Sequence, residues 1–312
     1  PKSADAVHMW SDEVEGLPKM AMVIQGGLKL EEHFTLETVK LYKKLYPEVL
    51  IIVSTWDDAD EETVKSMEEV GAVVIGNKKP GDFGQQNINL QIVSSREGVS
   101  KAGELGAKYV LKTRTDQRMY APNAMEYLYN LTQGFPVGEH VGGLGATDED
   151  VRDQNSEVAV PKSRIVGVSL NTFKYRQYGL SDMNIFGAIE DMELYWNVDL
   201  DDLSDQEVGP KSLPVPLCEV YFATNYLRKV GHEPAWSLED SWHAFALYFC
   251  VADEQSLDLY WHKYGRIREY RYPQYGGITN SQQMYFKEWL SLYMHNGERP
   301  VPAEGKIMSV IK

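Results

Sequence analysis

The chain has 312 residues, of which 43% are hydrophobic and 25% are charged, the composition of an ordinary globular protein. Its 31 basic and 46 acidic residues give a formal net charge of −15, which argues against nucleic acid as a partner and against broad adhesion to anionic lipid. A small anionic ligand remains compatible with this charge, because a few local donors can override the global sign.

The two cysteines, Cys218 and Cys250, fit no metal-binding spacing and indicate a reducing, cytoplasmic compartment. No apolar run approaches the ~20 residues that span a bilayer, and no signal peptide is visible. We therefore expect a cytoplasmic protein without a membrane span.

After a polar, aperiodic lead-in over residues 1–19, the first half of the chain alternates short apolar runs with amphipathic helices. In chain order we expect strands at Met20–Gln25, Val49–Ser54, Ala72–Ile75 and Lys108–Lys112, and helices at Thr35–Tyr46, Asp60–Val70 and Asn87–Leu105. This alternation predicts an α/β fold with a mostly parallel sheet that is covered by helices on both faces.

The second half is less regular. Residues 138–163 are rich in Gly, Asp and Glu and are expected to form a long loop, of a kind that is often functional. Beyond it we expect strands at Arg164–Asn171 and Ser181–Gly187, and helices at Ile189–Trp196, Leu217–Val230, Asp240–Cys250 and Asn280–His295.

Ligands of open parallel sheets bind beyond the carboxyl ends of the strands. That rule selects four segments: Gln25-Gly26-Gly27, Ser54 to Asp58, Gly76-Asn77 and Thr113 to Asp116. The two glycines let the backbone approach a nucleotide, although they match neither a dinucleotide fingerprint nor a P-loop and equally suit an ordinary turn. Trp56 could stack on a base and Asp57 could accept hydrogen bonds from a ribose, or the segment could be a helix-capping turn.

The last of these segments belongs to KTRTDQR, Lys112 to Arg118. Asp116 is a hard oxygen ligand, suited to a divalent cation between diphosphate oxygens. Lys112 and Arg114 alternate along the strand, project to one face and could meet phosphate. The competing interpretation is a salt-bridge cluster at the end of a strand.

Two further segments carry candidate ligands. Asn87 and Gln91 lie about one helical turn apart and share a face, so their amides could read a base or a sugar, or simply form a polar helix face. His243, in the segment EDSWHAF, could be a late metal ligand or an ordinary hydrogen-bonded histidine.

Five stretches carry a resemblance to a known family: VIQGGL (Val23–Leu28), YPEVLIIVSTW (Tyr46–Trp56), NINLQIVSSREGV (Asn87–Val99), KTRTD (Lys112–Asp116) and SDMNIFGAIEDMELYW (Ser181–Trp196). Together they resemble the WavE lipopolysaccharide-synthesis family, glycosyltransferases of surface-polysaccharide pathways. The resemblance covers a little over half of the chain.

The resemblance implies a GT-A-type fold, with residues 20–135 as the donor-binding half, merged in one domain with an acceptor-binding half over residues 136–312. In such folds a DxD-like motif holds a divalent metal on the donor diphosphate, and TRTD would fill that position. Arg114 stands where the motif has its first carboxylate, so either metal binding is weaker or Arg114 replaces part of the metal's charge. The family's asparagine helix usually has Arg where this chain has Leu90.

The expected activity is transfer of a sugar from a nucleotide-sugar donor to a hydroxyl of a glycan or glycolipid, in lipopolysaccharide or other surface-polysaccharide biosynthesis. A lipid-linked acceptor would bring the protein to the cytoplasmic face of the membrane. Two alternatives are a nucleotidyltransferase of nucleotide-sugar synthesis and a non-catalytic glycan-binding module. The first would normally grip a triphosphate with a basic Gly-rich loop, whereas here only Lys29 is close to the glycines.

The expected site has three parts. The metal, Mn²⁺ or Mg²⁺, would be held by Asp116 with His243. If the reaction inverts, a carboxylate among Asp182, Asp191 and Glu219 would deprotonate the acceptor; Glu190 is also eligible, and for each of them a surface carboxylate is the competing interpretation. The donor-binding residues would be Gln25, Gly26, Thr55, Trp56, Asp57, Asn87, Gln91, Lys112 and Arg114.

Overall fold

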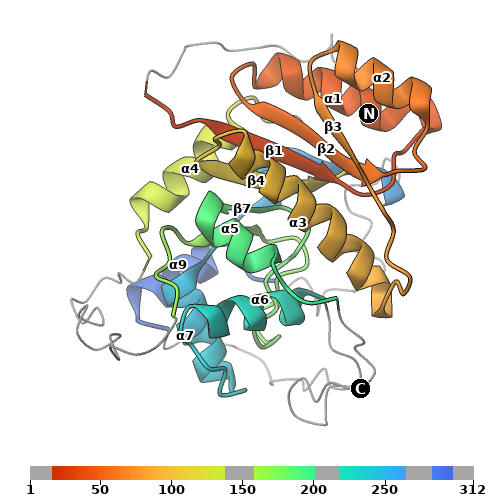
Figure 1. Ribbon diagram of the computed structural model, residues 1–312. Helices are drawn as coiled ribbons and strands as arrows, with labels where there is room; N and C mark the ends of the chain where they lie inside the picture. Colours follow the sequence, from red (N-terminus) through yellow and green to blue (C-terminus); the bar gives the residue numbers. More distant parts are fainter. Residues whose placement is uncertain (1–15, 138–157, 201–217, 265–282, 298–312) are drawn as a thin grey trace.

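The computed structural model describes residues 16–137, 158–200, 218–264 and 283–297 (Figure 1). Their centre is a seven-stranded sheet of order β3-β2-β1-β4-β7-β6-β8. Its strands are β1 (Met20–Gln25), β2 (Leu50–Trp56), β3 (Val73–Asn77), β4 (Tyr109–Arg114), β6 (Ile165–Val168), β7 (Ile185–Ala188) and β8 (Phe249–Ala252).

The four N-terminal strands are parallel, and β7 is antiparallel to both of its neighbours, β4 and β6. Since β8 is parallel to β6, only β7 runs against the common direction. The prediction of a mostly parallel sheet is therefore confirmed. Strand β1, MAMVIQ, is buried along its whole length, as a continuous apolar run in a sheet covered on both faces should be.

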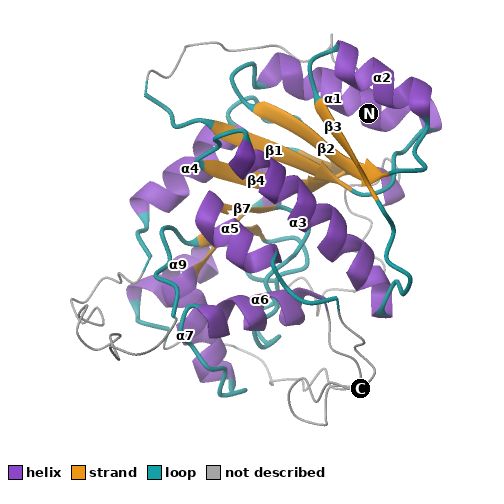
Figure 2. Ribbon diagram, in the orientation of Figure 1, coloured by secondary structure: helices purple, strands orange, loops and turns teal. Residues whose placement is uncertain are grey.

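Helices cover both faces of this sheet (Figure 2). On one face lie α3 (Ile88–Glu104) and α5 (Ile189–Trp196), with α6 (Cys218–Lys229) packed on α5. The other face is covered by α4 (Ala124–Gly134). Side chains alternate between the faces of a strand, so Tyr109 and Lys112, three positions apart on β4, point to opposite faces. Lys112 contacts Trp196 of α5, whereas Tyr109 contacts Tyr129 of α4.

The remaining elements flank this core. Helix α1 (Phe34–Leu45) packs against β2 and against α2 (Glu61–Glu69), while α7 (Leu238–Tyr248) and α9 (Phe286–Met294) pack against each other and β8. Strands β5 (Gln117–Met119) and β9 (Leu259–Trp261) form a separate antiparallel pair. Short 3-10 helices lie at η2 (Glu31–His33), η3 (Gln85–Asn87), η4 (Glu254–Leu257) and η5 (His262–Tyr264).

Several predicted boundaries differ from the structure. Strand β2 continues to Trp56, so Ser54 to Trp56 belong to the strand and not to a turn. The predicted helix Asp240–Cys250 ends at Tyr248, and Cys250 lies in β8. Residues 181–184 precede β7, and most of the predicted loop over 138–163 lies outside the described residues.

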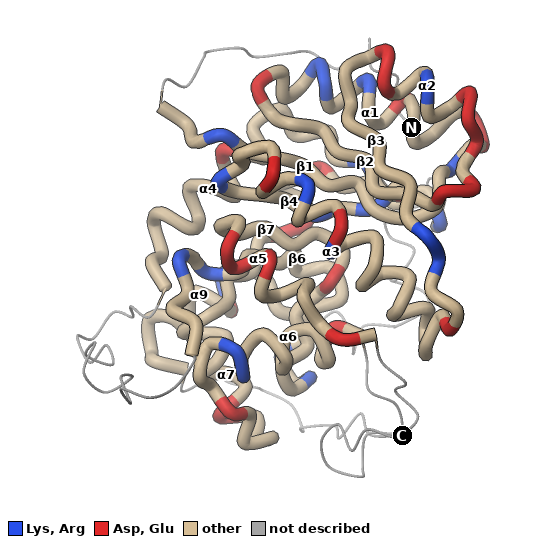
Figure 3. The backbone as a smooth tube through the Cα atoms, viewed as in Figure 1, with Lys and Arg blue, Asp and Glu red and all other residues tan. Residues whose placement is uncertain are grey.

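The net negative charge is carried in part by outer helices, such as α2 with Glu61, Glu62, Glu68 and Glu69 (Figure 3). Asp60 caps that helix, its carboxylate accepting a hydrogen bond of 2.9 Å from the Thr63 N–H. Among the described residues, no helix combines the length and the apolar character that a membrane crossing requires.

Candidate functional site

The carboxyl ends of β1, β2, β3 and β4 meet at one edge of the sheet, and polar side chains gather there on the face covered by α3. Gln25 at the end of β1 pairs in register with Ser54 on one side and Arg114 on the other. Ser94 of α3 donates a hydrogen bond of 2.7 Å to Gln25 Oε1. Because side chains alternate along a strand, Lys112, two positions before Arg114, faces α3 as well.

The Gly26–Gly27 loop is bonded to the strand ends beside it. Gly26 has φ +114°, which glycine adopts without strain, and its N–H donates to the Ser54 carbonyl at 3.0 Å. Thr115 donates through its N–H to Gln25 O at 3.0 Å and through Oγ1 to Gly27 O at 2.8 Å. The loop is therefore held against the end of β4, where sequence analysis expected a ligand.

The predicted nucleoside residues do not all face this loop. Trp56, only 9% exposed, borders it, because a Cβ added to Gly27 would lie 3.6 Å from the indole Nε1. Thr55 points to the opposite face of the sheet and is 1% exposed. Asp57 and Asn87 are exposed, and Asn87 has a left-handed backbone with φ 61° immediately before α3.

Asp116 lies in a tight contact with Arg114. The Arg114 Nε–H and Nη2–H donate to Asp116 Oδ1 and Oδ2 at 2.8 and 3.0 Å, and Trp261 Nε1–H donates to Oδ2 at 3.0 Å. Asp116 is 5% exposed. Its burial raises the pKa of the carboxyl group, but the hydrogen bonds and charge of Arg114, together with the Trp261 hydrogen bond and the Lys29 charge, outweigh this effect and hold the pKa below its usual value.

The two residues predicted to hold Mn²⁺ or Mg²⁺, Asp116 and His243, contact different groups in the described structure. Both oxygens of Asp116 already accept hydrogen bonds, and the described part of the chain contains no group of three or more His, Cys, Asp or Glu that could hold a metal ion. His243 lies on α7, near Asn296, whose carbonyl is 3.5 Å from the His243 Nδ1. The salt-bridge interpretation of TRTD therefore describes the observed contact.

A second polar cluster lies next to this one, around Asp182. Gln91 Nε2 donates to Asp182 Oδ2 at 2.7 Å, and Lys112 Nζ donates to the Asp182 backbone carbonyl at 2.6 Å. Lys112 is fully buried, with its Nζ 4.7 Å from the centre of the Trp196 ring. Burial lowers the pKa of Lys112 to about 7, and the nearby Asp182 charge offsets this only in part. Lys112 thus supports the Asp182 segment instead of facing a phosphate.

Glu219, in the first turn of α6, completes the Asp182 cluster. Asn171 donates a hydrogen bond to its Oε1, and Arg176 Nη1 lies 4.0 Å from the same oxygen. Burial raises the pKa of the neighbouring Cys218 thiol, and the charges of both Asp182 and Glu219 raise it further. The Cys218 thiol therefore lies close enough to Asp182 and to Glu219 for the charge of each to act on it.

Asp191 is at the opposite edge of the sheet, because β7 runs from Ile185, beside Lys112, to Ala188, beside Tyr109. It is fully buried and accepts hydrogen bonds from the backbone N–H groups of Lys162 and Ser163, at 2.7 Å from the latter. Burial raises its pKa to about 6 against the lowering effect of these bonds. Asp191 thus anchors the segment that leads into β6. It lies at the edge of the sheet opposite to Asp182, so the two carboxylates do not share a site.

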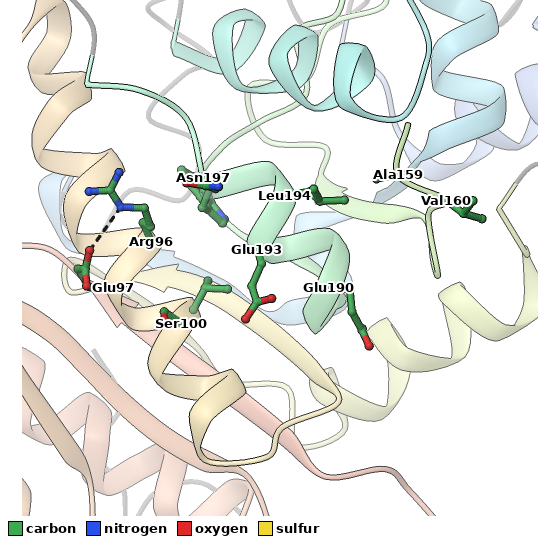
Figure 4. Close-up of a pocket in the computed structure, with 11 residues that line it drawn as sticks. Arg96, Glu97, Ser100, Ala159, Val160, Glu190, Glu193, Leu194 and Asn197 are labelled. Atoms are coloured by element: carbon green, nitrogen blue, oxygen red, sulfur yellow. Dashed lines mark hydrogen bonds and ion pairs between the residues drawn. The ribbon is translucent and has the colours of Figure 1, made fainter. Parts of the chain in front are cut away.

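A groove of about 620 Å³ lies between α3 and α5 (Figure 4). Its polar lining residues include Arg96, Glu97, Glu190, Glu193 and Asn197. None of the predicted donor-binding residues lines it. The groove meets the Asp182 cluster at Trp196, which also contacts Lys112. Glu190 lines the groove and precedes Asp191, so it lies away from Asp182.

Two residues that contact the site, Ser94 and Trp261, are not among those predicted from the sequence. Ser94 could have been found, since it follows Asn87 and Gln91 at helical spacing and shares their face. Trp261 carries no such signal, because it is 145 positions along the chain from the carboxylate that it contacts.

Comparison with known proteins identifies a matching family and several solved structures with low similarity to this chain. The model of the family described as WavE lipopolysaccharide synthesis matches residues 20–225. No curated protein matches the chain.

Three solved structures illustrate those likenesses. A glycosyltransferase involved in glycosylation of the major capsid of PBCV-1 is 9% identical, with 76% of this chain and 82% of that chain covered and a TM-score of 0.37. Glucosyl-3-phosphoglycerate synthase from Mycobacterium tuberculosis, in complex with Mg²⁺ and uridine diphosphate, is 9% identical over 76% and 69%, with a TM-score of 0.35. A cytidylyltransferase from Leptospira borgpetersenii serovar Hardjo-bovis is 11% identical over 62% and 70%, with a TM-score of 0.31. At these scores the likenesses do not extend to substrate or mechanism.

Proposed function

Because the chain belongs to the WavE lipopolysaccharide synthesis family, we propose that it is a glycosyltransferase that moves a sugar from a nucleotide-sugar donor to a hydroxyl of a glycan or glycolipid acceptor. The observation that carries the proposal is the pair of adjoining clusters at the carboxyl edge of the sheet. One offers donors for a nucleotide, and the other offers two carboxylates for sugar hydroxyls.

The nucleotide would lie against the Gly26–Gly27 loop. Ser94 fixes the Gln25 amide by bonding its oxygen, and Gln25 Nε2 donates to no described residue, so it can serve a ligand. Trp56 borders the same loop, and the exposed Asp57 follows it. Arg114, whose side chain is 28% exposed, would meet the diphosphate and stabilise the charge that develops on this leaving group.

The acceptor would lie at the Asp182 cluster. We place the general base at Asp182, because the only side chain bonded to its carboxylate in the described structure is the neutral Gln91 amide, whereas Glu219 lies beside the Arg176 cation. Glu219 would then bind acceptor or donor hydroxyls.

The activity is tested in two steps. A thermal-shift screen of uridine, guanosine, cytidine and adenosine diphosphate sugars should identify a donor that stabilises the protein, since a ligand that binds only the folded state raises its stability. Turnover is then measured as release of the nucleoside diphosphate, with bacterial glycan extracts as acceptors. If none of the donors stabilises the protein, the proposed function is wrong.

Asp182→Asn should lower kcat by about 100-fold or more, the usual contribution of a general base, while the donor affinity stays near the wild-type value. Asp191→Asn is the matched control, since it makes the same change at a carboxylate on the opposite edge. It should lower thermal stability but leave the turnover of the folded protein unchanged. Wild-type turnover by Asp182→Asn would remove Asp182 from catalysis.

A further inference from the structure

We propose that two side-chain cations, Arg114 and Lys29, hold the donor diphosphate, and that Asp116 positions Arg114 instead of binding a metal ion. The inference rests on the proposed function, because it assigns the diphosphate of that donor to this pair of cations. Inorganic pyrophosphate, which lacks base and sugar, carries the same chemistry and serves as the probe.

The first observation is the state of the Asp116 carboxylate. Its oxygens accept three hydrogen bonds, two from the Arg114 fork and one from the Trp261 indole. The buried carboxylate is therefore already compensated by the Arg114 cation, and breaking a buried ion pair of this kind is strongly unfavourable. Arg114 is the more accessible partner, with 28% of its side chain exposed against 7% for Asp116.

The second observation is the position of Lys29 beside this pair. Its backbone N–H donates to Thr35 Oγ1 at 2.8 Å, and that hydroxyl donates to the Thr115 carbonyl at 3.1 Å. Lys29 is exposed, and its ammonium group makes no ion pair within the described part of the chain. It lies close enough to Asp116 for its charge to act on that carboxyl group.

These contacts explain how the diphosphate could be bound. A guanidinium group donates parallel hydrogen bonds to phosphate oxygens in a fixed geometry, and Asp116 with Trp261 fixes that geometry before the ligand arrives. Asp116 neutralises Arg114, so the charge of Lys29 supplies the uncompensated attraction. Positive charges that are already in position stabilise the negative charge that builds up on the leaving diphosphate.

The test is calorimetric titration of the full chain with pyrophosphate, in EDTA and in Mn²⁺. Wild-type affinity should be similar in the two conditions. In EDTA, Arg114→Gln and Lys29→Gln should each weaken binding by about 10-fold or more, the scale of a charged hydrogen bond. Arg114→Lys, which keeps the charge but loses the fork, should fall between the wild type and Arg114→Gln.

Trp261→Phe should weaken binding in EDTA less than Arg114→Gln does, because it loosens the guanidinium without removing it. Asp116→Asn should still bind in EDTA, because the charge of Arg114 that Asp116 no longer neutralises offsets the loss of positioning. Arg228→Gln is the control, since Arg228 forms an ion pair of 3.2 Å with Glu233 at the end of α6, and it should bind like the wild type. If Arg114→Gln fails to unfold cooperatively, Lys29→Gln carries the test, because Lys29 is exposed.

Pyrophosphate binding that requires Mn²⁺ and disappears in Asp116→Asn would overturn the inference, and so would the absence of binding in EDTA. The failure of the proposed function is a different result. If a nucleotide sugar binds and turns over only with Mn²⁺, the glycosyltransferase stands and this inference alone is rejected.

Discussion

At the scale of single residues, a carboxylate's neighbours decide its role. Asp116, Asp182 and Asp191 are all nearly or fully buried, and the sequence around them does not separate them. Asp116 is bonded to a cation and an indole, Asp182 to a neutral amide, and Asp191 to backbone N–H groups. Apart from Arg114, those partners come from distant segments, so the sequence could supply the candidates but could not rank them.

Lys112 gives a prediction about pH and stability. Its pKa is about 7 in the folded protein against an ordinary 10.5, so between these values the unfolded chain binds a proton that the folded protein lacks. The free energy of unfolding should therefore rise with pH over this range, by up to about 1.4 kcal/mol per pH unit. Lys112 therefore lowers the free energy of unfolding most below pH 7, where both the folded and the unfolded protein carry its proton.

Urea denaturation of the wild type and of Lys112→Met, at several values from pH 7.5 to 9, measures this effect. The difference in the free energy of unfolding should shift in favour of the wild type as the pH rises, because methionine cannot titrate. A difference that stays constant with pH would show that Lys112 keeps its proton in the folded protein.

At the scale of elements, α3 links both clusters to the sheet. Gln91, Ser94 and Gly98 follow one another at helical spacing in α3, with Gln91 bonded to Asp182 and Ser94 to Gln25. Gly98 allows the helix to lie close to β1 and β2, because an added Cβ would be 2.3 Å from Val23 Cγ1 and 3.1 Å from Ser54 Cβ. The glycine thus sets the distance between α3 and the strands that end at the site.

Gly98→Ala should lower the free energy of unfolding by ~1–3 kcal/mol, because the added methyl group overpacks the core. This cost exceeds the gain of up to ~1 kcal/mol that alanine brings in helix propensity. Gly103→Ala, on the same helix, is the matched control. Its nearest contact, 2.8 Å away, is the flexible end of Glu193, so this variant should be neutral or more stable. Equal stability of the two variants in thermal unfolding would contradict the packing argument.

At the scale of the whole molecule, the sequence predicts the N-terminal half better than the rest. The four parallel strands each combine a short apolar run with a polar end, and this pattern predicted them correctly. The structure confirms these strands and the edge of the sheet where their carboxyl ends meet. Around Cys250, by contrast, the run FALYFCVA is apolar throughout, and periodicity does not distinguish a buried strand from a helix in such a run. Trp261 reaches Asp116 only through the pairing of β9 with β5, which no local pattern indicates.

The most direct test of the central claim is hydrogen exchange, measured by mass spectrometry, with and without the nucleotide sugar that stabilises the protein most. Binding at the carboxyl edge should slow exchange in peptides that cover residues 25–29, 54–58 and 112–117. Peptides over the α3/α5 groove at residues 190–197 should be unaffected. Protection confined to the groove, or absent from the three strand ends, would contradict the placement of the donor.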